Sequence, residues 1–401
     1  MSESWPEVCG LTLTFEWDDR FMGNPLASVS PQRLRARTSV KWRTYPEEVL
    51  PMFVAEMDVD IADPIREALI AAVNLSDTGY PFGDGYARAL SDFAASRWDW
   101  PFEPAHATPV ADVMHGVVEA LRLVTGRGDA VVVNPPVYFP FFGFVEDAGR
   151  HIVEAPLGAD GRIDFTVLEA AFRHAASAGS RAAYLLCSPH NPTGVVHTRA
   201  ELERIAQLAQ RYVVRVVVDE IHAPLVPAGA TFVPYLTVDP RGISLMSASK
   251  AWNLAGLKAA LMIAGLEALD DLRRVPEEVA HGTSHFGTIA HTAALRRGGE
   301  WLDELLAGLD GNRRLLGELL ALDLPEVGYR APEGTYLAWL DCRALPIDGE
   351  PADAFLERGQ VAFAPGKIFG TGGAGHVRIN IAASPESIAD GVARMVATVR
   401  V

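Results

Sequence analysis

Apolar runs alternate with amphipathic segments through the middle of the chain. The runs are short and rich in Val, Ile and Leu, as expected for strands that are buried on both faces. The predicted strands are Ala130–Asn134, Ala182–Cys187, Val214–Glu220, Ile243–Ser249 and Ala259–Gly265. Because strands and helices alternate, the pattern predicts an α/β sandwich with a mainly parallel sheet.

Two of the intervening segments carry helix signals. Gly116–Thr125 has the apolar spacing of a helix. Thr198 can N-cap a second helix that runs to about Arg211, and Glu201 stands three residues on, where it would complete a capping box. We therefore expect one helix to begin near Gly116 and the other just after Thr198.

The pattern changes after about Leu295. Trp301–Leu322 has the spacing of a long amphipathic helix. Strands are predicted in Gly334–Asp341 and His376–Ala382, before a terminal helix that follows Ser384–Pro385, so this part resembles a smaller α+β domain. The expected division is an N-terminal arm with part of the small domain in residues 1–55, a large domain in residues 56–290 and a C-terminal small domain in residues 291–401.

Composition narrows the class of protein. The chain has 401 residues, of which 49% are hydrophobic and 21% charged, so it has an ordinary globular composition and room for more than one domain. Its formal net charge of −16 and its lack of a long Lys/Arg run argue against a nucleic-acid partner. The short basic stretch Arg33–Trp42 is better explained by a subunit or surface contact.

Cysteines and apolar stretches bear on the compartment. Cys9, Cys187 and Cys342 are far apart and match no metal-ligand spacing, so we expect no metal site and no structural disulfide. The N-terminus has no signal-peptide pattern, and the longest apolar stretch, near Ala259–Leu269, is too short to span a membrane. These features predict a cytoplasmic protein without a membrane partner.

Four short motifs carry the candidate chemistry: SPHNPTG (Ser188–Gly194), VVVDEIH (Val216–His222), SASK (Ser247–Lys250) and HVRIN (His376–Asn380). Each is weak alone. Together they supply an amine for an aldehyde, an acid for a pyridine nitrogen, a donor for a ring oxygen and an arginine for a carboxylate. Pyridoxal 5'-phosphate (PLP) and an amino-acid substrate require these groups. The set predicts a PLP-dependent enzyme that acts on an amino acid.

Lys250 is the predicted catalytic residue. It follows an apolar run and small residues, so its amine would emerge at the carboxyl end of a strand and could form a Schiff base there. Asp219 ends another buried run and would pair with a protonated pyridine nitrogen. Asn191 and His222 can both donate to the ring oxygen, although a turn asparagine and a structural histidine are plain alternatives.

The phosphate of PLP needs anion donors. Gly116, Val117 and Val118 stand at the predicted helix start, where free N–H groups and the helix dipole favour an anion. The remaining candidates are the hydroxyls of Ser247 and Ser249 and the ammonium group of Lys258.

An aromatic ring and an arginine complete the predicted site. Tyr138, in PPVYFPFF (Pro135–Phe142), could stack on the pyridine face, although an aromatic there is as often part of the core. Arg378 lies in a predicted strand whose neighbouring residues point the other way. A partly buried arginine offers a bidentate fork to a carboxylate. We therefore expect Arg378 to bind the substrate's α-carboxylate, with an internal ion pair as the alternative.

Two other motifs point to different classes of protein. GTGGAG (Gly370–Gly375) matches GxGxxG, but it precedes a predicted strand and opens no helix, so it is not a dinucleotide site. SASK also matches the SxxK motif of serine hydrolases such as β-lactamases, but their SDN and KTG partner motifs are absent. A non-catalytic binding protein is a further alternative, and the presence of both Lys250 and Asp219 argues against it.

The chain resembles the fold-type I PLP enzymes of the class I/II aminotransferase family from about Arg37 to the C-terminus. Within that family it is similar to the C–S β-lyase branch, which contains cystathionine β-lyases and cysteine-S-conjugate lyases. The similarity is carried by KW…LPMFVAEMD (Lys41–Asp58), DTGYP (Asp77–Pro81), PPVYFPFF, SPHNPTG, VVVDEIHAPL, SASKAWNLAGLK and EGTYLAW. It implies a large domain with a mainly parallel, seven-stranded-type sheet in an α/β/α sandwich, and a smaller α+β domain.

The resemblance also implies residue roles and a partner. The family is dimeric, so a homodimer is expected in which Tyr80 reaches the phosphate of the neighbouring subunit, and Tyr80 is predicted to be catalytic together with Lys250. His281 and His285 could line the site from the partner chain. His222 stands where many aminotransferases have a tyrosine, which favours the lyase branch. Glu56 stands where the branch usually has an aspartate, so it is a candidate substrate-binding residue.

The expected reaction is β-elimination. Lys250 would remove the Cα proton of a cysteine thioether, and a thiolate would then leave from Cβ, giving a thiol, pyruvate and ammonia. L-Cystathionine would give homocysteine. Transamination of an L-amino acid shares the first steps and is the main alternative.

Overall fold

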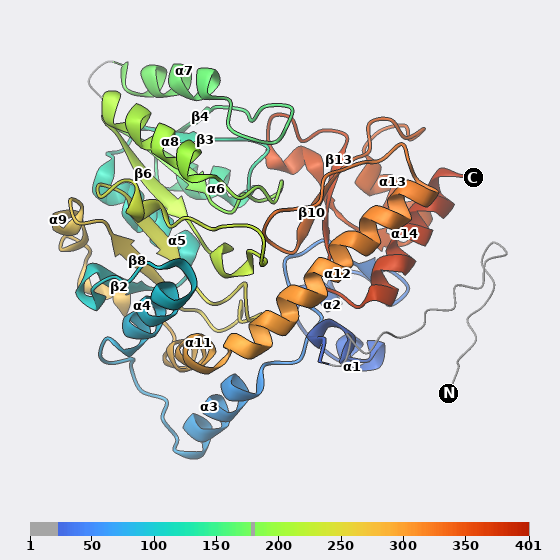
Figure 1. Cartoon of the computed structure of the whole chain (residues 1–401), viewed down its shortest axis with the longest axis horizontal. Helices are drawn as coiled ribbons and strands as arrows, with labels where there is room; N and C mark the ends of the chain where they lie inside the picture. Colours follow the sequence, from blue (N-terminus) through green and yellow to red (C-terminus); the bar gives the residue numbers. More distant parts are fainter. Residues whose placement is uncertain (1–22, 178–180, 401) are drawn as a thin grey trace.

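The computed structural model describes residues 23–177 and 181–400, which form two lobes (Figure 1). The larger lobe contains a seven-stranded sheet with the order β2-β8-β7-β6-β5-β3-β4. Its strands are β2 (Ala107–Val110), β3 (Ala130–Val133), β4 (His151–Glu154), β5 (Ala182–Cys187), β6 (Val214–Asp219), β7 (Ile243–Met246) and β8 (Ala260–Ala264). Strands β3 to β7 are parallel, and β8 is antiparallel to both of its neighbours. The predicted mainly parallel sheet is therefore confirmed.

Helices cover both faces of this sheet. In β6, Val217 packs in the apolar cluster that contains α5 (Val113–Val124). Its neighbour Val216 packs in the opposite cluster, which contains α7 (Phe165–Ala175) and α8 (Arg199–Arg211). Because successive side chains of a strand point to opposite faces, a strand covered on both sides needs a continuous apolar run.

The two predicted helix starts had different outcomes. The capping box of α8 is present: Glu201 N–H donates to Thr198 Oγ1 at 3.2 Å, and Thr198 N–H donates to Glu201 Oε2 at 2.7 Å. The start predicted at Gly116 was wrong. Helix α5 begins three residues earlier, at Val113, because the Asp112 carboxylate caps it by accepting from the His115 N–H at 2.9 Å.

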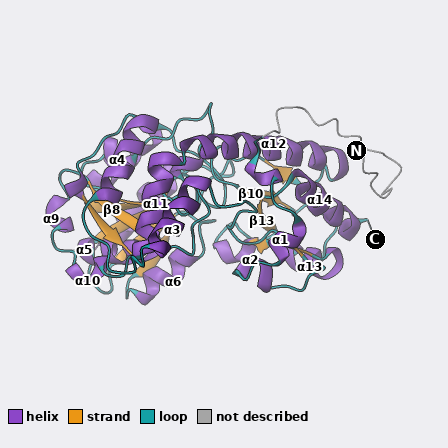
Figure 2. Ribbon diagram, turned by 90° about the horizontal axis from the view of Figure 1, so that it is seen from below, coloured by secondary structure: helices purple, strands orange, loops and turns teal. Residues whose placement is uncertain are grey.

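The smaller lobe contains a four-stranded antiparallel sheet with the order β12-β13-β10-β9. Figure 2 labels its strands β10 and β13. Its strands are β9 (Gly328–Tyr329), β10 (Leu337–Asp341), β12 (Ala364–Pro365) and β13 (His376–Asn380). Its helices are α13 (Pro351–Gly359) and α14 (Pro385–Val399), together with the long α12 (Gly299–Asp323), which extends between the two lobes (Figure 1). The predicted long helix and terminal helix are confirmed.

The first described residues lie beside the smaller lobe (Figure 2). They form α1 (Pro31–Arg35) and α2 (Val40–Arg43), and β1 (Leu50–Pro51) then pairs in parallel with β11 (Val361–Ala362). The remaining helices are α3 (Asp63–Asn74), α4 (Gly85–Trp98), α6 (Pro140–Asp147), α9 (Leu269–Leu272), α10 (Glu277–Ala280) and α11 (His285–Arg297). Short 3-10 turns occupy Pro25–Ala27, Pro104–His106, Ala223–Leu225, Tyr235–Thr237 and Gly366–Phe369.

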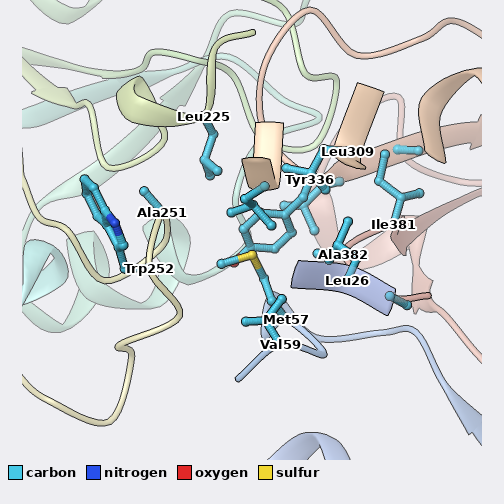
Figure 3. Packing of buried hydrophobic residues seen from close by; sticks show 14 of the residues in the cluster. Leu26, Met57, Val59, Leu225, Ala251, Trp252, Leu309, Tyr336, Ile381 and Ala382 are labelled. Atoms are coloured by element: carbon cyan, nitrogen blue, oxygen red, sulfur yellow. The ribbon is translucent and has the colours of Figure 1, made fainter. Parts of the chain in front are cut away.

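One apolar cluster joins the two lobes, and Met57 and Tyr336 lie near its centre (Figure 3). The side chains around them come from the N-terminal segment, the larger lobe and the smaller lobe: Leu26, Val59, Leu225, Ala251, Trp252, Leu309, Ile381 and Ala382. This packing brings the loop before Met57 to the junction where the polar side chains described below converge.

A membrane-spanning helix and a metal site were both predicted to be absent, and the structure bears on this for the described residues alone. None of the helices in residues 23–177 and 181–400 has the length and apolar character needed to cross a membrane. Over the same residues, no group of three or more His, Cys, Asp or Glu side chains could hold a metal ion. Cys187 and Cys342 are buried and free, and Cys9 lies outside the described residues.

Candidate active site

The candidate site lies at the carboxyl edge of the large sheet. Asp219 is the last residue of β6, and Lys250 follows the end of β7 by four residues. Asn191 follows the end of β5 by four residues. Because these strands are adjacent and parallel, their carboxyl ends meet at the same edge of the sheet. Arg378 enters from β13 of the smaller lobe, and its Nη1 donates to Asn191 Oδ1 at 3.0 Å.

Lys250 has the properties of an amine that is neutral part of the time. Its Nζ donates to the Ala55 carbonyl at 3.1 Å. Burial and the positive charge of Arg378 lower the pKa of Lys250 to about 8, although the negative charge of Asp219 opposes this shift. A lysine with a lowered pKa can act as a nucleophile towards an aldehyde and as a base.

Asp219 and His222 are buried polar groups that lack full partners. One carboxylate oxygen of Asp219 accepts from the Ile221 N–H at 3.0 Å, and among the described residues no cation forms an ion pair with it. Burial raises the pKa of Asp219 to about 6. His222 is 3% exposed, its Nδ1 has no hydrogen-bond partner, and burial holds its pKa well below the usual value. A protonated pyridine nitrogen for Asp219 and a ring oxygen near His222 would fit these groups.

Asn191 is held with its amide nitrogen available. Its backbone N–H donates to Cys187 Sγ at 3.4 Å, and its side-chain oxygen is taken by Arg378. The predicted tight turn is present: Gly194 has a φ of 72°, and an added Cβ would lie 2.2 Å from Pro332 Cβ. Because only the amide nitrogen remains free to donate, this geometry fits the predicted contact with a ring oxygen.

Arg378 is 4% exposed and is held by hydrogen bonds rather than by an ion pair. Besides its bond to Asn191, its Nη2 donates to the Phe53 carbonyl at 3.1 Å, and its Nε has no partner. Burial lowers the pKa of Arg378 to about 10, and the nearby Tyr138 and Tyr336 oppose this shift. An internal ion pair, the alternative that the sequence left open, is absent among the described residues. A substrate carboxylate would supply the missing negative charge.

Tyr138 lies close to the same groups. Its side chain is half-buried, and burial together with the negative charge of Asp219 raises its pKa to about 12. The hydroxyl therefore stays protonated at neutral pH. The charges of Asp219 and Arg378 both act on this hydroxyl, which fits a ring that packs on PLP, and this role stays a prediction.

The phosphate candidates are arranged differently from the prediction. Gly116 is inside α5, and its N–H donates to the Asp112 carbonyl at 2.9 Å, so it is not a free donor. Val117 is fully buried in the sheet-facing core, and Val118 is half-buried in the next turn. The first N–H groups of the helix belong to Val113 and Met114, and the Asp112 N-cap could have revealed this in the sequence.

Two of the predicted phosphate donors, the Lys258 ammonium and the Ser247 hydroxyl, already have partners within the chain. Lys258 Nζ donates to Asp112 Oδ2 at 2.8 Å at the start of α5. Ser247 Oγ donates to the Ala259 carbonyl at 2.7 Å and accepts from the Ser249 N–H at 3.2 Å. These contacts place Lys258 and the two serines near the helix start and the Lys250 loop. Their binding of phosphate stays a prediction.

Sequence reasoning missed how the loop Phe53–Met57 is fixed at the site. Every carbonyl of this loop accepts from a side chain: Phe53 from Arg378, Val54 from Asn380, Ala55 from Lys250 and Tyr336, Glu56 from Lys41 and Asn380, and Met57 from Arg37 and Asn253. Asn380 stands two residues after Arg378 in β13, so strand periodicity could have placed both on one face. The contacts of Tyr336 and Asn253 had no such signal.

Tyr80, His281 and His285 gather elsewhere in this chain. Tyr80 is 84% exposed, and its ring centre lies 6.2 Å from that of His281. His285 Nε2 lies 3.1 Å from Asp77 Oδ2. Within the described residues, no hydrogen bond or ion pair joins these three side chains to Lys250 or Asp219. A role in the site of a neighbouring subunit stays a prediction.

Comparisons with known proteins agree with this fold. The sequence pattern of the family described as "Aminotransferase class I and II" matches residues 78–395. A protein of Mycobacterium tuberculosis named "Putative cystathionine beta-lyase" is 55% identical over 396 residues, covering 93% of this chain and 97% of the relative. Cystathionine beta-lyase PatB of Bacillus subtilis is 35% identical, covering 89% of this chain and 95% of that protein.

Solved structures give the same picture. Cystalysin from Treponema denticola, whose crystal structure contains PLP, aligns with a TM-score of 0.85 at 27% identity, covering 94% of this chain and 98% of that chain. The PLP-bound C-S lyase from Staphylococcus hominis aligns with a TM-score of 0.83 at 26% identity, covering 91% and 96%. The fold is that of the fold-type I PLP enzymes. Within that class, the chain belongs to the class I and II aminotransferase family.

Proposed function

We propose that this protein is a PLP-dependent C–S β-lyase that cleaves L-cystathionine or a related cysteine S-conjugate to a thiol, pyruvate and ammonia. The observation that carries the proposal is the position of Lys250, whose pKa is lowered to about 8 between the buried Asp219 and the buried Arg378. The relatives named cystathionine beta-lyase support the substrate class.

The charge of each site residue determines which part of the cofactor or substrate it would bind. When bound, PLP supplies the electron sink that lets a proton leave the substrate's Cα. Asp219 would hold the pyridine nitrogen, and Arg378 would exchange Asn191 Oδ1 and the Phe53 carbonyl for the substrate's α-carboxylate. Lys250 in its neutral form would take the Cα proton, and the thiolate would leave from Cβ and be protonated. One water would then convert the remaining three-carbon fragment to pyruvate and ammonia.

The reaction is tested by measuring both products together. Purified protein is mixed with PLP and L-cystathionine, and free thiol and pyruvate are assayed in the same sample. Equal amounts of thiol and pyruvate support β-elimination. Formation of a keto acid that needs an added keto-acid acceptor and releases no thiol contradicts the lyase proposal and favours an aminotransferase.

We also propose that the protein works as a homodimer in which Tyr80 contacts the phosphate bound by the neighbouring subunit. Three apolar or aromatic side chains near the α3–α4 connection are exposed: Leu75 by 78%, Tyr80 by 84% and Phe82 by 101%. Exposed apolar side chains that cluster in this way are typical of interfaces. Sedimentation of the PLP-loaded protein gives the test, and a monomer at working concentration contradicts the proposal.

The compartment follows from cysteine chemistry. Cys187 and Cys342 are buried and unpaired, as is usual in a reducing environment, and we propose a cytoplasmic location. The test is fractionation of the native cells, and we expect the protein in the cytoplasmic fraction.

A further inference from the structure

The candidate site contains one charged group for which the proposed reaction has no use. Asp219 has the pyridine nitrogen as its partner, Arg378 has the α-carboxylate, and Lys250 has the cofactor aldehyde. Lys258, which also acts on Lys250, pairs with Asp112, whereas Glu56 has no role in the proposed reaction. The residue before it, Ala55, accepts from Lys250 Nζ at 3.1 Å and from the Tyr336 hydroxyl at 3.0 Å, and the Glu56 charge raises the pKa of both groups.

Glu56 is held in place by hydrogen bonds, and no cation among the described residues forms an ion pair with its carboxylate. Its side chain is half-buried, and its backbone carbonyl is bound by Lys41 and Asn380 at 3.2 and 2.6 Å. Its Oε1 accepts from Ser39 Oγ at 2.5 Å. Ser39 stands at the N-cap of α2 but makes no side-chain cap there, so its hydroxyl orients Glu56 instead of the helix.

Lys41, the cation that binds the Glu56 carbonyl, is already neutralised by another carboxylate. Lys41 Nζ lies 2.6 Å from Asp58 Oδ1, and both side chains are buried, so this pair satisfies itself. Among the described residues, no lysine, arginine or histidine forms an ion pair with the Glu56 carboxylate. A partly buried carboxylate without a cation attracts one from solution or from a ligand.

Glu56 is also not suited to assisting Lys250. Its negative charge raises the pKa of Lys250 and therefore works against the neutral amine that the reaction needs. A group that opposes the base but is oriented by a dedicated hydroxyl is better explained by substrate recognition.

We propose that Glu56 binds an ammonium group on the leaving half of the substrate. This inference rests on the proposed function, because it concerns the sulfur substituent that departs as a thiol. The preferred substrates are then cysteine S-conjugates whose substituent carries an amine, a class that includes L-cystathionine. Conjugates with a neutral substituent of the same size bind less well, since they leave the carboxylate without a partner.

Two conjugates of nearly equal size test the proposal. S-(2-aminoethyl)-L-cysteine ends in an ammonium, and S-propyl-L-cysteine ends in a methyl group at the same position. We expect the wild-type protein to favour the aminoethyl compound in kcat/KM by about tenfold or more, and Glu56→Gln to remove most of that preference. Gln keeps an oxygen that can accept from Ser39, so the loop contact is retained.

Two further variants separate recognition from general effects. Glu47→Gln removes an exposed charge nearby in the sequence, and we expect the preference to stay at the wild-type ratio. Ser39→Ala frees the Glu56 carboxylate to move, and we expect an intermediate ratio. A ratio that is unchanged in Glu56→Gln, or an equal loss on both conjugates, overturns the proposal.

Binding gives the same comparison without turnover. The two conjugates are titrated into the PLP-loaded protein, and the change in cofactor absorbance gives their dissociation constants. If no pyruvate forms but the binding ratio still depends on Glu56, the lyase proposal fails and the recognition by Glu56 stands. If pyruvate forms and neither ratio depends on Glu56, the recognition fails and the lyase stands.

Discussion

Two regions of the site are built in different ways. The residues beneath the predicted cofactor come from the carboxyl ends of neighbouring strands, so Asp219 and Lys250 owe their places to one sheet. The loop Phe53–Met57 has no regular structure and is held at every carbonyl by side chains from both lobes and the N-terminal segment. The difference indicates that the two regions have different roles. The strand ends supply the reactive groups, and the loop sets the geometry of those groups and the choice of substrate.

The largest loss of activity is expected when a residue at the strand ends is replaced. Replacing Lys250 by Ala removes the base and the amine for the aldehyde, and we expect thiol release to fall by about 10³-fold or more. The spectrum of bound PLP should also lose the band that depends on a lysine adduct. Lys367→Ala, which removes an exposed lysine paired with Asp353, is the matched control. Retention of the band in Lys250→Ala contradicts the assignment.

Asp219→Asn tests the second strand-end group. The pyridine nitrogen loses its ionic partner, and we expect turnover to fall by about 10²-fold with weaker PLP binding, measured by kcat and by equilibrium dialysis. Near-normal kinetics refutes the role of Asp219.

The same variant has an opposite effect on the stability of the protein without PLP. The folded pKa of Asp219 is raised from 3.8 to about 6, so its burial as an anion destabilises the fold once the pH rises through this range. Asn has no charge to bury and can still accept from the Ile221 N–H. We expect a gain of about 3 kcal/mol in unfolding free energy above pH 6, and none below about pH 4, in urea titrations at several pH values. If the difference in unfolding free energy between the variant and the wild type stays constant across this pH range, burial of the charged carboxylate is not its cause.

For the loop, Asn380→Ala removes the two hydrogen bonds that the Asn380 amide donates, one to the Val54 carbonyl and one to the Glu56 carbonyl. We expect about a tenfold loss in kcat/KM and a loss of about 2 kcal/mol in stability, from steady-state kinetics and urea unfolding. Asn312→Ala is the control, because Asn312 is a buried asparagine that also donates to two carbonyls, those of Ile381 and Ala383. Equal activity losses in both variants mean that the loop has no special role.

The smallest effect is expected for Tyr336→Phe. This change removes one hydrogen bond, from the Tyr336 hydroxyl to the Ala55 carbonyl at 3.0 Å, and keeps the ring. Since Lys250 binds the same carbonyl, we expect a loss in kcat of about threefold to tenfold with little change in KM. A loss in kcat as large as that of Lys250→Ala places Tyr336 among the reactive groups. The reactive groups would then not come from the strand ends alone.

The same comparison explains what the sequence could predict. Asp219 and Lys250 were predictable because an apolar run followed by a polar residue is a local signal, and parallel strands bring such ends together. The loop was not, because Asn380 binds carbonyls more than 320 positions away in the chain. The start of α5 was missed although its signal was local, since Asp112 was not read as the N-cap.

Chemical labelling of the lysine tests the central claim most directly. The PLP-loaded protein is reduced with borohydride, which fixes the cofactor to the amine that holds it, and the labelled peptide is identified by mass spectrometry. The account predicts a single label on Lys250. A label on Lys258 or Lys41 instead, or no label at all, contradicts it.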